Sequence, residues 1–207
     1  MAEQEQARGQ GERWVEERFD GEDWALDEIS RRHYERCQFV EVDLTEAVLT
    51  GCTFEQCEFA NVKFNAATLV RCALLGCTIR RCSFFDTAIE DCKLAGTQFI
   101  ECELRSIRIS GGDWAYANLR GENLAGIKLA GLKLREADLT EADLSGCDLK
   151  RADLSYARLH NTTLRGADLR GADLTGVRLR GVDLTEVRID LAQAGLFAAA
   201  HGARVEP

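Results

Sequence analysis

Nine cysteines and three histidines are the side chains with the most obvious potential for chemistry, because thiolates and imidazoles bind metals and thiols form disulfides. Their spacing argues against both uses. No two cysteines form the closely spaced CxxC pair of a zinc site, and His33, His160 and His201 lie far apart in the sequence. No histidine has the Ser or Cys and the acid that a catalytic triad needs. We therefore predict no catalytic residues, no metal site, no cofactor and no enzymatic activity.

The cysteines instead follow a repeat with a period of five residues. A large apolar residue, the centre, occupies every fifth position from Phe39 to Ile189, which makes 31 consecutive positions. The residue two positions before each centre is Ala, Cys, Val, Thr or Gly at 27 of these 31 positions. A period of five fits neither a helix nor a flat strand, so the chain must turn a corner every five residues. All the cysteines occupy the small position; they are Cys37, Cys52, Cys57, Cys72, Cys77, Cys82, Cys92, Cys102 and Cys147.

A chain that buries two residues in five and bends after each unit forms a solenoid, in which stacked coils pair through backbone hydrogen bonds. Free cysteine behaves as a small buried hydrophobe, and this is the interpretation that the register favours. Thiols stacked one coil apart, such as Cys52 and Cys72, leave metal binding as the weaker alternative.

The pattern at Ala117-Asn118-Leu119, Ala137-Asp138-Leu139, Ala152-Asp153-Leu154 and Ala172-Asp173-Leu174 resembles the pentapeptide-repeat family. The resemblance covers about three quarters of the chain. It implies an all-β solenoid, the right-handed quadrilateral β-helix, with four units and about 20 residues in each coil.

The register divides the chain into five parts. Residues 1–12 are predicted to be a disordered tail, and residues 13–36 an irregular coil that caps the N-terminal end. The β-helix is expected over 37–189, a short capping or dimerisation helix over 190–202, and a tail over 203–207. Asp190 is placed to begin the helix and Gly202 to end it. The sequence has no long apolar run and no signal peptide, so we expect a cytoplasmic protein that does not enter a membrane.

Four bulky residues interrupt the small position in the middle of the chain: Ile107, Glu122, Ile127 and Leu132. They should widen or distort the coil there. Burying the Glu122 carboxylate without partners would be costly, so we expect this side chain to rotate to the corner and reach solvent. The alternative is a functional buried acid.

Residues 20 apart should stack on one side of the coil, which sorts the net charge of −9 by side. One side, with centres at Leu44, Phe64, Phe84 and onward, has an excess of outward acids, against only Lys63, Arg105 and Arg165 as bases. The next side is net positive. We take the acidic side as the candidate surface for binding a partner; its acids are Asp43, Glu46, Asp86, Glu103, Asp143, Asp183 and Glu186.

Within the family, the chain resembles most the fluoroquinolone-resistance group, Qnr and MfpA, and the MfpA branch above all. The features that carry this are the opening Asp27–Arg36, the uninterrupted register and the ending Ala192–Gly202, which is similar to a C-terminal dimerisation helix. The resemblance implies a homodimer that binds DNA gyrase by imitating DNA, inhibits supercoiling and relieves gyrase poisons. It implies no small-molecule substrate. We expect the dimer contact at Leu191, Ala194, Leu196, Phe197 and Ala200.

Two alternatives remain. A stiff scaffolding rod with an unrelated protein partner would suit the outward Leu75, Phe85, Ile100, Tyr116 and Tyr156. Direct nucleic-acid binding through the basic side is disfavoured by the overall acidity.

Overall fold

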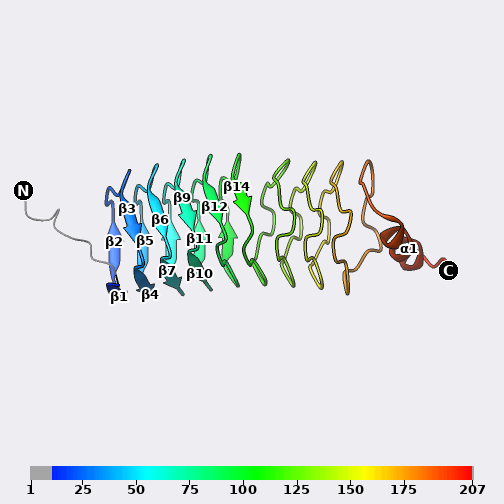
Figure 1. Ribbon diagram of the computed structural model, residues 1–207, viewed down its shortest axis with the longest axis horizontal. Coiled ribbons are helices and arrows are strands. Elements are labelled where there is room, and N and C mark those ends of the chain that lie inside the picture. The colour runs from blue at the N-terminus through cyan, green and yellow to red at the C-terminus, as the bar shows by residue number, and fades with distance from the viewer. Residues whose placement is uncertain (1–10, 207) are drawn as a thin grey trace, which may run out of the picture.

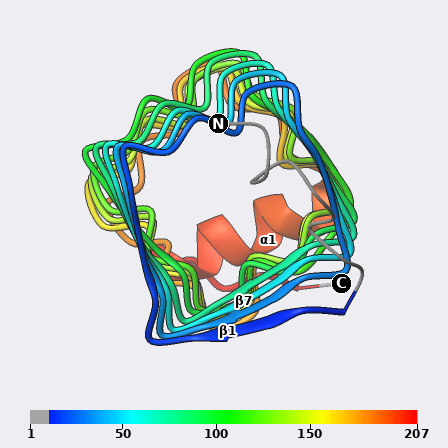
Figure 2. The same ribbon diagram turned by 90° about the vertical axis from the view of Figure 1, so that its left-hand side faces the viewer.

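The computed structural model describes residues 11–206 as a straight stack of coils that ends in one helix (Figure 1). Each coil contains 20 residues, since Trp14 pairs with Tyr34, Tyr34 with Phe54 and Phe54 with Leu74 in parallel register. Residues 13–189 therefore make about nine coils. Viewed along the axis, the coils superpose on a four-sided outline, and the helix lies across the far end (Figure 2). This is the quadrilateral β-helix expected from the repeat.

Three of the four sides carry short parallel strands. The first sheet contains β1 (Arg13–Val15), β4 (His33–Glu35), β7 (Thr53–Glu55) and β10 (Ala73–Leu75). The second contains β2 (Arg18–Asp20), β5 (Gln38–Val40), β8 (Glu58–Ala60), β11 (Thr78–Arg80) and β13 (Gln98–Ile100). The third contains β3 (Glu28–Ser30), β6 (Val48–Thr50), β9 (Thr68–Val70), β12 (Ala88–Glu90) and β14 (Arg108–Ser110). The fourth side is held by single bridges such as Asp43–Lys63.

The described strands end at Ser110, where the sequence changes. Beyond it, the residue before the centre is often Asp or Asn, and its side chain accepts a hydrogen bond from the backbone N–H two residues later. Asp138 does so from Thr140 at 3.0 Å and Asp153 from Ser155 at 3.0 Å. This local bond favours a turn over an extended strand, so the Asp-Leu units give tight corners joined by single bridges.

The interior is filled by the centres and the small residues, as the register predicts. In the N-terminal half the aromatic centres stack from coil to coil: Phe39 lies 4.7 Å from Phe59, and Phe64 lies 4.6 Å from Phe84. All nine cysteines are free thiols, and all are buried except the half-buried Cys102. All the thiols except that of Cys82 donate to a backbone carbonyl of the neighbouring coil, as Cys72 does to Leu49 at 3.3 Å. Their prediction as small core residues is confirmed.

The segment 13–36 is more regular than the sequence predicts. It carries β1 to β4 in the same 20-residue register as the later coils. The missing small residues are compensated by aromatic packing, because Trp14 stacks on Tyr34 at 4.8 Å and the buried Arg32 lies 5.5 Å over the Trp14 ring. The predicted tail over 1–12 falls mostly outside the described residues.

Glu122 does not reach solvent, so that expectation is wrong. Its side chain is 4 % exposed and accepts a hydrogen bond from the Cys102 N–H at 3.3 Å. Burial raises the pKa of this carboxyl, and the bond from Cys102 opposes the rise. The expected distortion is visible nearby: among the described residues no bridge joins Glu103 to Asn123 or Arg108 to Lys128. The bulky Ile107, Ile127 and Leu132 are buried at this interruption.

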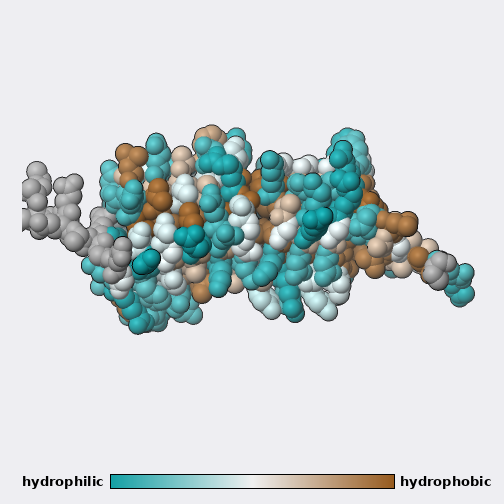
Figure 3. All heavy atoms as spheres, viewed as in Figure 1, coloured by the Kyte–Doolittle hydropathy of each residue, from teal (hydrophilic) through white to brown (hydrophobic). Residues whose placement is uncertain are grey.

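The chain ends in helix α1 (Leu191–Ala200), which closes the last coil. Asp190 is its N-cap, as predicted, and forms a capping box with Gln193. Gly202 follows the helix at a φ of 89°, a conformation that glycine adopts at low cost. Phe197 is buried against the coil, and apolar atoms gather at this end of the rod (Figure 3). Within residues 11–206, no helix is long and apolar enough to cross a membrane.

Candidate functional site

The acidic side predicted from the sequence is the strandless side of the coil. Bridges join Asp23 to Asp43, Asp43 to Lys63 and Lys63 to Ser83, so one outward residue in each coil stacks above the last. A parallel ladder spaces these residues by about 4.8 Å. The seven predicted acids therefore lie along one side of the rod.

Three of these acids have a structural role as well as a charge. Asp43, Asp143 and Asp183 each accept a hydrogen bond at 2.9 Å from the backbone N–H two residues later. At Asp183 the Thr185 hydroxyl donates a second bond at 2.6 Å. Hydrogen bonds from Thr45 and Thr185 lower the pKa values of Asp43 and Asp183. These three residues hold turns, so replacing them would perturb the coil together with its surface.

Glu46, Asp86 and Glu186 occupy corners, where the backbone φ is 58°, 58° and 60°. Corner side chains project outward, and Glu46 and Glu186 are exposed. Glu103 lies on the flat part of the side and accepts a bond from the Ser83 hydroxyl at 3.3 Å. Among the described residues, the side chains of Glu46, Glu103 and Glu186 accept no hydrogen bond from a turn N–H, so they can be changed without removing a turn.

Ion pairs offset much of the acidic charge. Lys63 lies 3.1 Å from Asp43, Arg105 lies 2.6 Å from Glu103, and Arg165 lies 3.1 Å from Glu186. Arg108, from the adjacent side, pairs with Asp86. Among the described residues, Glu46, Asp143 and Asp183 have no basic partner within ion-pair distance. Exposed pairs contribute little to stability, so a partner rich in Lys and Arg could replace the bases.

The C-terminal helix separates the five predicted dimer residues into two groups. Leu191 is 90 % exposed and Leu196 is 47 % exposed, whereas Phe197 is 5 % exposed and packs on the chain's own last coil. Ala194 and Ala200 are half-buried. Phe197 is therefore a cap residue, and the surface left for a second copy centres on Leu191 and Leu196.

Gln193 anchors the helix and is a residue that the sequence reasoning missed. Its side-chain amide is 3 % exposed and donates to the carbonyl oxygens of Leu169 at 2.6 Å and Ala172 at 3.0 Å. The Leu169 oxygen also accepts from the Ala172 N–H at 2.9 Å, whereas the Ala172 oxygen has no backbone donor among residues 11–206. The signal in the sequence is a single polar residue three positions after the N-cap in an otherwise apolar helix.

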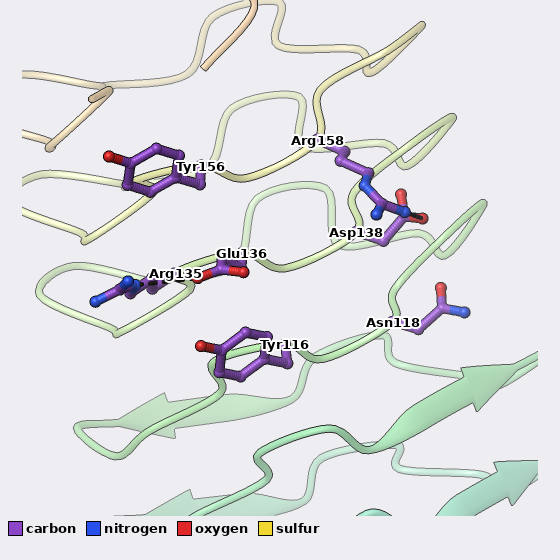
Figure 4. Close-up of a pocket in the computed structure, with 7 residues that line it drawn as sticks. All are labelled: Tyr116, Asn118, Arg135, Glu136, Asp138, Tyr156 and Arg158. Carbon is purple, nitrogen blue, oxygen red and sulfur yellow. Dashed lines mark hydrogen bonds and ion pairs between the residues drawn. The ribbon is translucent and has the colours of Figure 1, made fainter. Parts of the chain in front are cut away.

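A shallow hollow of about 500 Å³ lies at another corner of the rod (Figure 4). The exposed rings of Tyr116 and Tyr156 flank it two coils apart. The Arg135 guanidinium lies 5.9 Å from the Tyr156 ring, and Arg158 lies 3.4 Å from Asp138. The two tyrosines that the sequence placed on one side thus border a real concavity. Its charges are mixed, which suits a protein side chain better than a highly charged ligand.

Metal-binding chemistry finds little support in the geometry. Across residues 11–206, no three side chains of His, Cys, Asp or Glu are placed to hold a metal ion. Burial raises the pKa of Cys82 to about 12, which disfavours the thiolate that a metal requires, whereas a hydrogen bond with Cys72 lowers the pKa of Cys52 to about 7.

Comparison with protein families decides the assignment. The model for pentapeptide repeats matches residues 37–76, 117–155 and 152–189, in eight copies. The chain belongs to the pentapeptide-repeat family. The Asp that precedes many of the Leu centres in its C-terminal repeats is the turn-forming residue described above, which gives the family pattern its physical meaning here.

Solved structures share the fold of this pentapeptide-repeat protein. Full-length QnrB1, described as a plasmid-mediated fluoroquinolone resistance protein, aligns with a TM-score of 0.78 and 23 % identity, covering 92 % of this chain and all of that one. HetL, a pentapeptide-repeat protein involved in heterocyst differentiation regulation from the cyanobacterium Nostoc sp. strain PCC 7120, aligns with a TM-score of 0.55 and 23 % identity. That alignment covers 86 % of this chain and 87 % of HetL. A search of curated protein sequences finds no match.

Proposed function

We propose that this pentapeptide-repeat protein binds DNA gyrase as a mimic of its DNA, modulates or inhibits supercoiling, and so confers resistance to fluoroquinolones or other gyrase poisons. The supporting observation is a straight rod with one side on which seven acids face only three bases, Lys63, Arg105 and Arg165. The likeness of the whole chain to QnrB1 supports the same assignment. In this proposal the protein is a cytoplasmic binding protein and not an enzyme.

The dimensions favour imitation of shape more than of charge. About nine coils at about 4.8 Å make a rod of about 43 Å. A DNA duplex of that length carries about 25 phosphates, at one charge per about 1.7 Å. The acidic side offers seven predicted acids, four of which are ion-paired. Gyrase would therefore recognise a rigid rod with local acidic positions, and its bases would exchange with Lys63, Arg105, Arg108 and Arg165.

A homodimer through α1 would extend the mimic. The exposed Leu191 and Leu196 are the apolar residues that a second copy would cover. Two rods end to end would span about 86 Å, equivalent to about 25 base pairs at about 3.4 Å each. The dimer is part of the proposal, and its test is the oligomeric state in solution.

The acidic side can be tested by changing glutamates that form no turn. We would measure gyrase binding of a triple variant with Glu46→Lys, Glu103→Lys and Glu186→Lys. The matched control is Glu41→Lys, Glu58→Lys and Glu101→Lys, which changes net charge equally on an adjacent side where all three residues are exposed. The proposal expects at least tenfold weaker binding of the first variant at moderate salt, and a much smaller effect of the control.

Gyrase supercoiling with and without a quinolone gives the functional readout. The wild-type protein should inhibit supercoiling or restore it in the presence of the drug, and the acidic-side variant should do neither at the same concentration. If the acidic-side variant and the control variant affected supercoiling equally, the acidic side would be excluded as the gyrase-binding surface. If the wild-type protein had no effect on supercoiling with or without the drug, gyrase would be excluded as its partner.

A scaffolding role with another protein partner is the second candidate. The observation that favours it is the corner hollow between Tyr116 and Tyr156, where exposed aromatic rings could receive a side chain. Tyr116→Ala with Tyr156→Ala would then reduce partner binding and leave gyrase inhibition unchanged.

A further inference from the structure

The hydrogen-bond ladder opens between the last two coils on the side that contains Arg158. One coil earlier it is closed: Leu139 N–H donates to the Arg158 carbonyl at 3.0 Å, and Glu141 N–H to the His160 carbonyl at 2.9 Å. The equivalent N–H groups of Leu159 and Asn161 have no backbone acceptor among residues 11–206. In a closed ladder these N–H groups point to the next coil, so here they face the opening.

The opening is local. It continues to Leu164, whose N–H also has no backbone acceptor among residues 11–206, and the ladder is intact on either side. Tyr156 N–H donates to the Thr175 carbonyl at 2.7 Å, and Leu169 N–H to the Arg188 carbonyl at 2.8 Å. The interruption in the middle of the rod has a steric cause, the bulky residues around Glu122. Small residues occupy the inward positions at the last coils, namely Ala157, Thr162, Val177 and Val182, so overpacking does not explain this second opening.

The opening forms a cavity of about 710 Å³ with a strongly basic lining. Arg158, His160, Arg178 and Arg180 line it, and no acidic residue does. Arg178 and Arg180 have no carboxylate within 4 Å among the described residues, and Arg158 reaches Asp138 only at 3.4 Å. Tyr156 forms part of the wall. The volume lies within the range of about 300–1,000 Å³ that small-molecule sites occupy.

Bases from both coils gather at this opening. At other places opposite charges stack one coil apart, as Lys63 does on Asp43. Where like charges stack, as Asp148 does on Asp168, each carboxylate of that pair has a base beside it, Lys150 or Arg170. Here the 20-residue register places Arg178 beside Arg158 and Arg180 beside His160. Like charges at adjacent ladder positions destabilise the pairing. An anion between the coils would offset this repulsion and also accept hydrogen bonds from the two open N–H groups.

We propose that this opening is a binding site for a small organic phosphate or polyphosphate. In proteins, phosphate oxygens accept hydrogen bonds from guanidinium groups and from free backbone N–H groups. The cavity has room beyond one phosphate group, so the body of the ligand would lie against Tyr156. The proposal does not rest on gyrase binding, because the four basic residues lie on the side next to the acidic one and include none of its acids.

The test uses the full chain with three probes at matched ionic strength: inorganic phosphate, pyrophosphate and citrate. Calorimetric titration should show one saturable site for pyrophosphate, which also raises the midpoint of thermal unfolding. Arg178→Gln with Arg180→Gln should weaken binding at least tenfold. Arg120→Gln is the control, because this exposed arginine lies on the same side but pairs with Glu141 at 2.8 Å and should leave binding unchanged.

Two further measurements keep the proposal falsifiable if the double variant is unstable. Amide exchange of Leu159 and Asn161 should be fast without ligand and slow with pyrophosphate. The double variant without ligand should unfold at a midpoint no lower than the wild type, since repulsion is removed. Protection of both amides without ligand, no saturable binding to the wild type, or equal binding by the double variant would overturn the proposal. Tighter binding of citrate than of pyrophosphate would overturn the phosphate assignment.

Discussion

The aromatic stack in the N-terminal half allows a quantitative test of how the core holds the rod together. Phe59 is 1 % exposed, stacks on Phe39 at 4.7 Å and lies 5.4 Å from Phe54 and 5.8 Å from Phe64. A buried Phe removes roughly 150–250 Å² from water, which at about 25 cal/mol per Å² gives an upper bound of roughly 4–6 kcal/mol. Measured Phe→Ala costs in protein cores are about 3–5 kcal/mol.

Phe59→Ala should therefore lower the free energy of unfolding by about 4 kcal/mol. The ladder on either side fixes the coil spacing, so the cavity cannot close by collapse. Urea unfolding followed by circular dichroism measures the change. Phe85→Ala is the matched control: this residue is 51 % exposed, and its replacement should change stability by less than about 0.5 kcal/mol. A cost below about 1 kcal/mol at Phe59 would refute the account of the core.

Three further predictions concern Glu122, Gln193 and the exposed leucines of α1. Burial raises the pKa of Glu122 above its usual 4.5, so its favourable contribution is present below pH 4.5 and lost as pH rises through the folded pKa. Glu122→Gln, which keeps the acceptor for Cys102, should be more stable than the wild type in urea at about pH 8 and no more stable at about pH 4; the reverse order contradicts the buried acid. Gln193→Ala should cost about 1–3 kcal/mol in thermal unfolding, because the Ala172 carbonyl loses its donor and the Leu169 carbonyl loses one of two. An unchanged stability would show that Gln193 does not anchor α1. Leu191→Glu with Leu196→Glu should convert a dimer to a monomer in sedimentation experiments, and an unchanged mass would place the dimer contact elsewhere.

The periodic part of the fold follows directly from the sequence. A centre such as Leu144, with Ala142 two residues before it, has one way to bury both side chains, and each repetition reinforces the register. The same register correctly placed the cysteines in the core. The role of Asp190 as the N-cap could also be predicted from the sequence, because an N-cap side chain hydrogen-bonds to backbone N–H groups of residues close to it in the chain.

The departures from the repeat were harder to predict, because they depend on what lies one coil away. Glu122 is buried because the N–H of Cys102, at the equivalent position one coil earlier, offers its carboxyl a partner. The first coil is regular because Trp14 and Tyr34 stack where small residues are absent. The open N–H of Leu159 has no signal in its own repeat, since the opening arises from the coil that follows.

The acidic side was predicted as a set of residues but not as a set of interactions. Sequence spacing placed Asp43 and Lys63 on one side, and in the structure they form an ion pair there. It could not show that Arg108 reaches across a corner to Asp86, because that depends on side-chain direction at positive φ. Nor did it show that Asp143 holds a turn.

Competition with DNA tests the proposed mimicry most directly. Gyrase would be loaded with a fluorescent duplex of gyrase-binding length, and the protein titrated in while anisotropy is followed. The account predicts that the wild-type protein displaces the duplex and that the Glu46, Glu103 and Glu186 reversal variant does not. A stable complex that contains gyrase, the duplex and the protein together, with no loss of bound DNA, would contradict it.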